Sequence, residues 1–442
     1  MPRNVTLDPA LRSWVTTAAT PGTDFPVQNL PYGVFRRRRS GEAWRVGVAI
    51  GDDVLDLSAA SHAGLLDGAF SAGTTAFDAS LNTLMGLGAA AWSALRRQVS
   101  DLLTSGTERG ILAEQAAPDL LIAQAECEMR VPADVGDYTD FYASVHHATN
   151  VGSMFRPGNP LLPNYKWVPI GYHGRASSIV VSGTPVTRPR GQASEDPTGP
   201  PAYAPTRRLD YEAELGFFVG PGNPLGVPIG IAEAAEHIFG VCLLNDWSAR
   251  DVQSWEYQPL GPFLAKNFAS SVSPWVVTME ALTPFRAPAF SREADDPQPL
   301  PYLLDETDQR SGGLDIVIDV LIRTAAMRER GAPAVRLSRG NARDLYWTPA
   351  QMLAHHAGNG CNLRPGDLLG SGTISGQTKE SRGCLLERAW RGTEPVSLPG
   401  GEERRFLEDG DEVILHARCE ATGAAPIGFG MCSGEVRPAA AS

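Results

Sequence analysis

The chain has 442 residues, with 38 Lys and Arg side chains against 50 Asp and Glu and a formal net charge of −12. An acidic chain whose basic run is limited to Arg36–Arg39 is not expected to bind nucleic acid, because phosphate contacts need clustered positive charge. It has no long apolar run, no signal-peptide core and no CxxC pair among its six cysteines, so we expect a cytoplasmic enzyme that enters no membrane.

Residues 1–125 are predicted to form a small N-terminal domain. The segment 45–57 contains two apolar stretches joined by a Gly-Asp-Asp turn, which predicts a β-hairpin. Apolar residues recur at helical spacing from 92 to 102 and predict a helix, with Arg96 expected on the side away from its apolar face. A polar connection follows, and we place the domain boundary near residue 125.

Residues 126–442 are predicted to be rich in strands, so the chain is expected to be mostly β, in an α+β arrangement. The run 314–320 alternates with a period of about two residues. The clearest helix begins at Thr348, where a capping box is followed by proline at the first helical position. The Gly- and Pro-rich segment 190–207 and the segment 288–301 are predicted to be long loops.

Three local motifs have simple interpretations. The glycines of 220–226 are spaced differently from a dinucleotide-binding loop and predict a turn. The segment 370–376 fits neither a phosphate loop nor a nucleophile elbow, but its glycines allow the close backbone approach of a site-lining loop. His355 and His356 would be about 100° apart on a helix and cannot face one metal, so we favour an interaction with the helix C-terminus.

Glu212 and Glu214 lie two residues apart where an apolar strand is predicted to begin. A period of two places both carboxylates on one face. Neighbouring carboxylates repel strongly when they are buried, unless a cation lies between them, whereas water screens them on an exposed face. The segment alone leaves both a cation site and a solvated strand face open.

A second polar stripe begins at Asp246. If the segment is helical, four residues share one narrow face: Asp246, Arg250, Gln253 and Tyr257. Such a face would line a wet cleft, and an exposed helix with an ordinary Asp–Arg pair explains the same pattern. Pro259 predicts an early end to the helix, which leaves the placement of Tyr257 open.

The segment 136–150 combines acids, hydroxyls and histidines. In a helix, Asp140, Ser144 and His147 would share a face. A histidine near a carboxylate can act as a general base beside a metal, and a structural histidine is the common alternative.

The acids of the three segments have one property in common, because all of them offer only oxygen ligands. They are Asp140, Glu212, Glu214 and Asp246. Such a set favours Ca²⁺ or Mg²⁺ over zinc. Its four negative charges would need Arg250 and Lys266 nearby to approach neutrality.

Five motifs resemble the fumarylacetoacetase family and are specific to it within the broader superfamily. They occupy residues 136–142 with 147–152, 171–178, 245–251, 259–264 and 362–369. The likeness spans residues 131–435, and the N-terminal part fits the family's small SH3-like barrel more loosely. The resemblance implies a larger catalytic mixed β-roll domain over 126–442, and a homodimer.

The resemblance also implies an activity, which is hydrolysis of the carbon–carbon bond of 4-fumarylacetoacetate to fumarate and acetoacetate. This is the last step of tyrosine and phenylalanine catabolism. It further implies that the four acids hold Ca²⁺ or Mg²⁺, which would chelate the diketo group. His147, oriented by Glu387, would activate water.

Further roles are implied by resemblance. Stabilisation of the oxyanion and the developing carbanion falls to Arg250, Gln253 and Lys266. The residues implied to hold the substrate are Tyr142, Arg156, Tyr172, Arg250, Gln253, Tyr257 and Thr373.

The chain departs from the family in two places. The family's second cation, usually Mg²⁺ near Lys266, relies on a threonine where this chain has Ser270, which leaves a second site open. The segments 190–207 and 324–338 match poorly. The alternatives are a sibling acylpyruvate hydrolase or oxaloacetate decarboxylase on the same scaffold, or a non-catalytic metal-binding protein.

Overall fold

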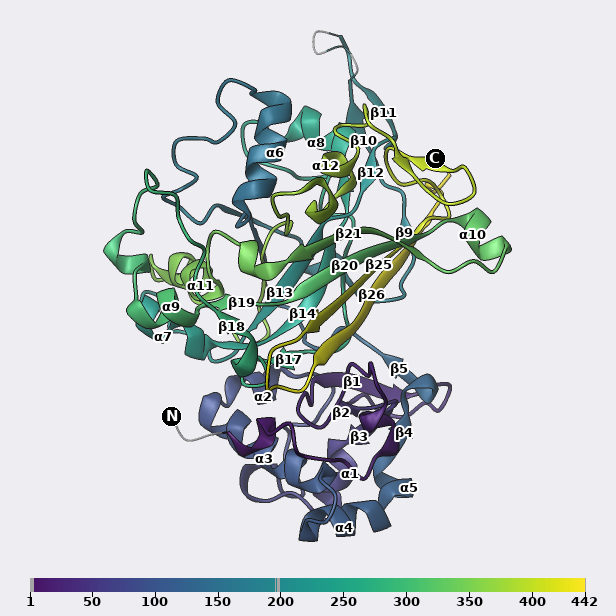
Figure 1. The fold of residues 1–442 in the computed structure, drawn as a ribbon, viewed down its shortest axis with the longest axis vertical. Coiled ribbons are helices and arrows are strands. Elements are labelled where there is room, and N and C mark those ends of the chain that lie inside the picture. The colour runs from purple at the N-terminus through teal and green to yellow at the C-terminus, as the bar shows by residue number, and fades with distance from the viewer. Residues whose placement is uncertain (1–3, 195, 197–198, 442) are drawn as a thin grey trace.

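A computed structural model describes residues 4–194, 196 and 199–441 (Figure 1). A smaller N-terminal part lies below a larger C-terminal part, and both are built around sheets. This mixed, strand-rich architecture confirms the predicted fold class. Within the described residues, every helix is too short or too polar to cross a membrane.

The N-terminal part is built on a five-stranded antiparallel sheet in the order β4-β3-β2-β1-β5. Its strands are β1 (Tyr32–Arg37), β2 (Arg45–Ile50), β3 (Asp53–Asp56), β4 (Leu121–Ala123) and β5 (Cys127–Met129). Its helices are α1 (Leu57–His62), α2 (Asn82–Gly86), α3 (Ala89–Leu103), α4 (Glu108–Gln115) and α5 (Ala117–Leu120). The hairpin predicted over 45–57 is β2–β3, while β5 continues the sheet beyond residue 125.

The predicted helix over 92–102 is confirmed as α3, but the expectation for Arg96 is wrong. Arg96 is 2% exposed. Its guanidinium donates to the Thr6 hydroxyl at 2.9 Å and to the carbonyl oxygens of Gln28 and Asn29. The N-terminal segment of the chain covers this side of α3, and such a long-range contact leaves no trace in the helical period.

The C-terminal part contains an eight-stranded sheet with the path β7-β6-β22-β13-β14-β16-β8, and β17 pairs with β14. The strands are β6 (Tyr138–Phe141), β7 (Gly171–His173), β8 (Ile179–Val181), β13 (Ala213–Val219), β14 (Ile238–Asp246), β16 (Ser270–Val272), β17 (Val277–Thr278) and β22 (Leu368–Gly370). We call it the central sheet.

A five-stranded sheet packs against one face of the central sheet, through contacts of β25 and β26 with β14. Its strands are β9 (Val186–Thr187), β20 (Val317–Arg323), β21 (Val335–Asn341), β25 (Glu412–Cys419) and β26 (Ile427–Arg437). The remaining short strands are β10 (Arg190–Ala193), β11 (Ala202–Pro205), β12 (Leu209–Asp210), β15 (Ser248–Ala249), β18 (Arg286–Ala287), β19 (Gly313–Leu314), β23 (Val396–Ser397) and β24 (Glu403–Arg404). The helices are α6 (Val145–Phe155), α7 (Ile231–Ala234), α8 (Arg250–Glu256), α9 (Glu306–Ser311), α10 (Ala325–Glu329), α11 (Pro349–Ala357) and α12 (Leu385–Arg388).

The central sheet is a middle layer, and its strands β13 and β14 are buried along their whole length. Phe217 and Val241 belong to the core shared with the five-stranded sheet. Their neighbours Phe218 and Cys242 belong to the core shared with the N-terminal part. Because successive side chains point to opposite faces, a strand covered on both sides must be apolar at every position, which accounts for the continuous apolar sequence of these strands.

The structure agrees with three of the other predicted segments and contradicts one predicted loop. The run 314–320 lies in β19 and β20, α11 begins after Thr348 with the predicted capping box, and 288–300 contains no helix or strand. The long loop predicted over 190–207 is wrong as stated, because β10 and β11 pair there as an antiparallel hairpin. Backbone pairing with a distant part of the segment stabilises these strands despite their Gly and Pro content.

Candidate active site

Four carboxylates meet at one end of the central sheet. Asp140 is the third residue of β6, Glu214 lies on β13, and Asp246 is the last residue of β14. Glu212 directly precedes β13 and accepts the Asp246 amide through its own carbonyl at 3.2 Å. One oxygen from each carboxylate lies within 4.8 Å of the others, and all four residues are buried.

This cluster fits a cation. Asp140 Oδ1 and Glu214 Oε1 are buried and have no hydrogen-bond partner among the described residues. Burial and the neighbouring carboxylates raise the pKa values of Asp140 and Glu214 well above their ordinary values. Unpaired buried carboxylates are strongly unfavourable, and oxygen-only donors suit hard divalent cations, so a Ca²⁺- or Mg²⁺-sized ion would satisfy the set.

Lys266 lies against the same acids. Its Nζ forms ion pairs with Glu212 and, at 2.7 Å, with Asp246 Oδ2. Burial opposes its charge, but Asp246 and Glu212 raise the pKa of Lys266, so it stays an ammonium. Ser270 donates to Asp246 Oδ1 at 2.8 Å, which places its hydroxyl and Lys266 beside the same carboxylate.

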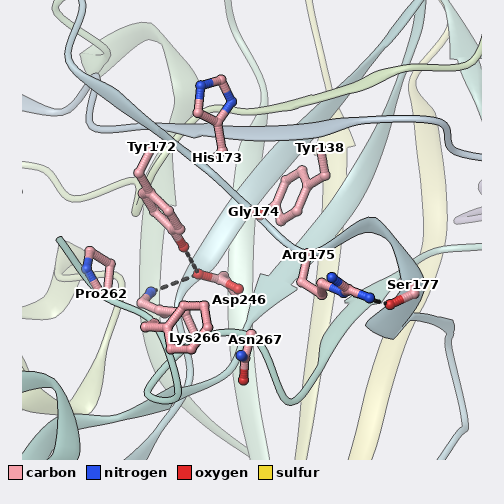
Figure 2. A pocket seen from close by; sticks show the side chains of 11 residues that line it. Tyr138, Tyr172, His173, Gly174, Arg175, Ser177, Asp246, Pro262, Lys266 and Asn267 are labelled. Carbon is pink, nitrogen blue, oxygen red and sulfur yellow. Dashed lines mark hydrogen bonds and ion pairs between the residues drawn. The ribbon is translucent and has the colours of Figure 1, made fainter. Parts of the chain in front are cut away.

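A cavity of about 400 Å³ opens onto this end of the cluster (Figure 2). Figure 2 shows the side chains of Tyr172 and Lys266 converging on Asp246, with the Tyr172 hydroxyl donating to Asp246 Oδ2 at 2.9 Å. His173 and Arg175 line the same cavity. A small polar molecule can therefore approach the carboxylates from outside.

His147 and Glu387 form a buried pair beside the acids. His147 lies in the first turn of α6, and its Nδ1 is 2.6 Å from Glu387 Oε2 on α12. Burial opposes the charge of Glu387, but electrostatic attraction to His147, followed by hydrogen bonds from His147, Asn150 and Cys384, lowers its pKa to about 2. An ionised carboxylate only accepts hydrogen bonds, so Nδ1 carries the hydrogen and Nε2 is left as a base.

Arg250 begins α8 and is held by three acceptors. Its Nε donates to Asp210 Oδ2 at 2.9 Å, and its Nη1 lies 2.7 Å from Glu212 Oε1 and 3.1 Å from Gln253 Oε1. Its Nη2 is buried and has no partner among the described residues. Lys266 and Arg250 keep the pKa of Glu212 well below its ordinary value although the carboxylate is buried.

The two helical stripes expected from spacing are corrected by the structure. Asp140 lies on β6 and Ser144 caps α6, so only His147 of that set is helical. Asp246 ends β14, and α8 begins at Arg250. In both segments a helix begins within four residues of the strand end, so a change of secondary structure separates residues that were expected on one helix face.

The residues implied to hold a substrate lie at different depths. Tyr142 directly follows β6, with its ring centroid 5.3 Å from that of His147, and Thr373 is buried. Arg156 follows the last turn of α6, with its Nη2 donating to the Pro160 carbonyl. Tyr257 follows α8 and is 41% exposed. The structure thus brings Tyr142 next to the base and leaves Tyr257 near the surface.

The glycine-rich segment after β22 approaches the acids closely, as its sequence suggested. A Cβ on Gly370 would lie 2.6 Å from Asp140 Oδ1. Gly372 has φ of +76° and donates its amide to Glu214 Oε2 at 3.0 Å. Only glycine combines that backbone conformation with that proximity.

For two further motifs the structure favours the simpler interpretation over a metal site or a dinucleotide loop. His355 and His356 lie in the last turn of α11 and bond to different partners, Tyr302 and Thr139. The segment 220–226 contains turns and no helix.

Several residues of the site were not singled out in the sequence. Asp210 accepts from Arg250, which is 40 residues away in the sequence. Ser375 and Cys384 donate to Glu387 and precede it by 12 and 3 residues. Asn150 had a usable signal, because it lies three residues after His147 and both reach Glu387 from one helix face.

A strand-rich scaffold with a buried, cation-fitting acid cluster beside a histidine–glutamate base defines a class, the metal-assisted hydrolases. A solved fumarylacetoacetate hydrolase from Exiguobacterium antarcticum has a similar fold, with a TM-score of 0.50 at 15% identity over 92% of this chain and 99% of that one.

The family models for the fumarylacetoacetase N-terminal and the fumarylacetoacetate hydrolase C-terminal domains match residues 28–132 and 137–437. The chain is 51% identical to the fumarylacetoacetase of Bos taurus over 94% of this chain and 97% of that protein. It is 50% identical to that of Homo sapiens over the same shares, and 48% identical to that of Oryza sativa over 97% and 98%. The chain belongs to the fumarylacetoacetate hydrolase family.

Proposed function

We propose that the protein hydrolyses 4-fumarylacetoacetate to fumarate and acetoacetate. The observation that carries this proposal is the buried His147–Glu387 pair next to the four carboxylates that fit one divalent cation. The near full-length similarity to fumarylacetoacetases supports the same substrate. The reaction would complete tyrosine and phenylalanine breakdown, and we expect it to take place in the cytoplasm.

The metal site proposed for this activity consists of Asp140, Glu212, Glu214 and Asp246. When bound there, Ca²⁺ or Mg²⁺ would polarise the diketo oxygens as a Lewis acid. We keep both ions in the proposal, because the ligand types suit either one. Ser270 retains the hydroxyl that a second cation near Lys266 would use.

The chain's own residues supply the proton transfers. His147 Nε2 takes a proton from a water molecule, whose oxygen bonds to the ketone carbon of the fumaryl group while the carbonyl electron pair moves to its oxygen. Glu387 stabilises the imidazolium that forms. The unpartnered Arg250 Nη2 donates to the resulting oxyanion, and Gln253, whose Oε1 already accepts from Arg250, offers its amide NH₂.

Bond cleavage then balances the reaction. The carbon–carbon bond breaks, its electron pair passes to the acetoacetate carbon, and Lys266 stabilises the developing negative charge. The proton held on His147 passes to that carbon, the oxyanion reforms a C=O bond, and the new carboxylic acid of fumarate releases its remaining water proton to solvent. Tyr142, Arg156, Tyr172, Tyr257 and Thr373 are proposed to hold the two ends of the substrate.

The decisive experiment compares substrates. The purified protein is incubated with fumarylacetoacetate, with acylpyruvates and with oxaloacetate, with and without a chelator, and products are quantified by chromatography. We expect fumarate and acetoacetate as the main products and loss of turnover with the chelator. Faster cleavage of an acylpyruvate or decarboxylation of oxaloacetate would favour a sibling enzyme on the same scaffold. Absence of turnover on all three would favour a non-catalytic metal-binding protein.

We also propose a homodimer, as the family resemblance implies. Large apolar side chains are exposed along one segment, from the end of α8 to residue 264, and we call them the 255–264 patch. They are Trp255, Tyr257, Leu260, Phe263 and Leu264. Several large exposed apolar side chains within ten residues of sequence are a candidate contact surface, and a second copy of the chain would cover them.

A further inference from the structure

Asp210 is a fully buried carboxylate that lies between the two halves of the candidate active site. It ends β12, and none of its surface is exposed. Its Oδ1 accepts the amides of Tyr211 and Leu385 at 2.9 and 2.8 Å. Its Oδ2 accepts the Leu386 amide and Arg250 Nε, both at 2.9 Å. Each carboxylate oxygen of Asp210 therefore accepts two hydrogen bonds from N–H groups.

Toward one side, Asp210 fixes helix α12. This helix has four residues, which is too short to be stable on its own, and Cys384 before it makes no side-chain capping bond. Asp210 instead accepts the first two amides of the helix, at Leu385 and Leu386. The next residue is Glu387, which holds His147 Nδ1. The position of the base therefore depends on the carboxylate that caps α12 from a distant strand.

Toward the other side, Asp210 fixes the guanidinium of Arg250. The bond to Nε holds one edge of the planar group, Nη1 reaches Glu212 and Gln253, and Nη2 is left buried without a partner among the described residues. A planar fork held at Nε can present Nη2 in only one direction. Asp210 therefore also determines where the proposed oxyanion donor points.

We propose that Asp210 is a positioning residue that couples the His147–Glu387 base to the Arg250 anion donor. The assignment rests on the proposed function, because these groups act on the substrate and Asp210 acts through them. A displacement of about 1 Å in a reacting group can reduce turnover about 100-fold, and loss of Asp210 would displace two such groups together.

The test uses Asp210→Asn in the full-length protein loaded with Ca²⁺ or Mg²⁺. In either amide orientation, the new NH₂ group faces two N–H donors, so the four bonds cannot all persist. We expect kcat for fumarylacetoacetate to fall about 100-fold, with KM and cation affinity within about threefold of wild type. A higher KM or a lower cation affinity, with kcat unchanged, would overturn the proposal.

Asp411→Asn is the matched control. Asp411 is equally buried, accepts from Arg404 Nε and Nη2 at 2.8 and 3.0 Å and from the Glu408 amide, and lies in a different segment from these site residues. It should lower thermal stability as Asp210→Asn does and leave kcat unchanged. An equal kcat loss in both variants would mean that only general stability is involved.

Double-mutant cycles separate positioning from a general structural effect. In Glu387→Gln and Arg250→Met backgrounds, Asp210→Asn should reduce kcat by about tenfold or less, because part of its effect is already lost. The same 100-fold loss in all backgrounds would overturn the coupling. If Asp210→Asn does not fold, Asp210→Ser replaces it; failure of both while Asp411→Asn folds would assign Asp210 a purely structural role. Lack of wild-type turnover would instead reject the proposed function.

Discussion

The side chain of His147 illustrates how burial and bonding assign a chemical role to one residue. It is 3% exposed, and its Nδ1 is committed to a carboxylate that only accepts hydrogen bonds. That bond selects the tautomer with a free Nε2. The role of the residue in the proposed reaction follows from this tautomer. His147 is not a member of the four-carboxylate set proposed to hold the cation.

His147→Ala should therefore abolish turnover and leave the cation site intact. Removal of a general base lowers kcat by about 10²- to 10⁴-fold. Calorimetric titration should show unchanged cation affinity, since His147 is outside the ligand set. His146→Ala, on the same helix but packed against Phe290, is the control and should retain activity. Turnover of His147→Ala within tenfold of wild type would contradict the role in water activation.

Glu387 predicts a pH dependence of stability. Its pKa is lowered to about 2 from an ordinary value near 4.5, so its ionised form stabilises the folded state fully above pH 4.5, and this contribution is lost as the pH falls toward 2. Glu387→Gln should reduce the free energy of unfolding by about 3 kcal/mol at pH 7, and by less at each lower pH below 4.5.

Urea unfolding at several pH values measures this difference. Glu394→Gln removes an exposed partner of Lys379 and serves as the control, with a nearly unchanged free energy of unfolding. A Glu387→Gln deficit that stays constant down to pH 3 would show that the stabilisation does not come from the charge.

At the scale of elements, the end of β22 forms one wall of the acid cluster. β22 lies between β6 and β13 in the central sheet, with Gly370 paired to Asp140 on one side and to Gly216 on the other. The absence of a side chain at Gly370 leaves room for two carboxylates to approach across three strands. Parallel and antiparallel pairing of these strands thus creates the cluster.

Gly370→Ala should weaken cation binding. The added methyl carbon would lie 2.6 Å from Asp140 Oδ1 and 3.1 Å from Glu214 Oε2, so at least one ligand must move. We expect cation affinity to fall about 10- to 100-fold, measured by calorimetry. Gly230→Ala is the control, since a Cβ there meets open space. Unchanged affinity of Gly370→Ala would mean that these carboxylates are not ligands.

At the scale of the whole molecule, the central sheet joins the two parts of the chain into one packed structure. Phe239 of β14 packs against Trp92 and Tyr32 of the N-terminal part, with ring centroids 5.1 and 5.9 Å apart. Tyr32 also exchanges backbone hydrogen bonds with Val276. The N-terminal part therefore covers the face of the central sheet that is opposite to the five-stranded sheet, and it supports the strands that carry the acids.

The 255–264 patch gives a prediction at the same scale. Leu260 is 96% exposed, and Leu260→Asp would place a charge in the proposed contact between two copies. Sedimentation velocity should show a dimer for wild type and a shift toward monomer for this variant. Leu225→Asp, 79% exposed in another loop, is the control and should leave the dimer intact. A wild-type monomer, or a dimer unaffected by Leu260→Asp, would contradict the proposal.

Local sequence determined much of this protein. The apolar period gave α3, the capping box gave the start of α11, and the oxygen-only acids indicated a hard-cation site before any geometry was known. The apolar run after Glu214 predicted the strand that the structure shows as β13. These features depend on neighbouring residues, whose spacing is visible in the sequence.

Tertiary structure decided the features that depend on distant segments. Spacing alone predicts Asp140 and Asp246 on helices, whereas pairing with β22 and β16 makes them strand residues. Arg96 is buried because the N-terminal segment folds over α3, and Asp210 gains its partners from α8 and α12. Periodicity reports only which way side chains point along one element, and contacts between distant segments decide what those side chains meet.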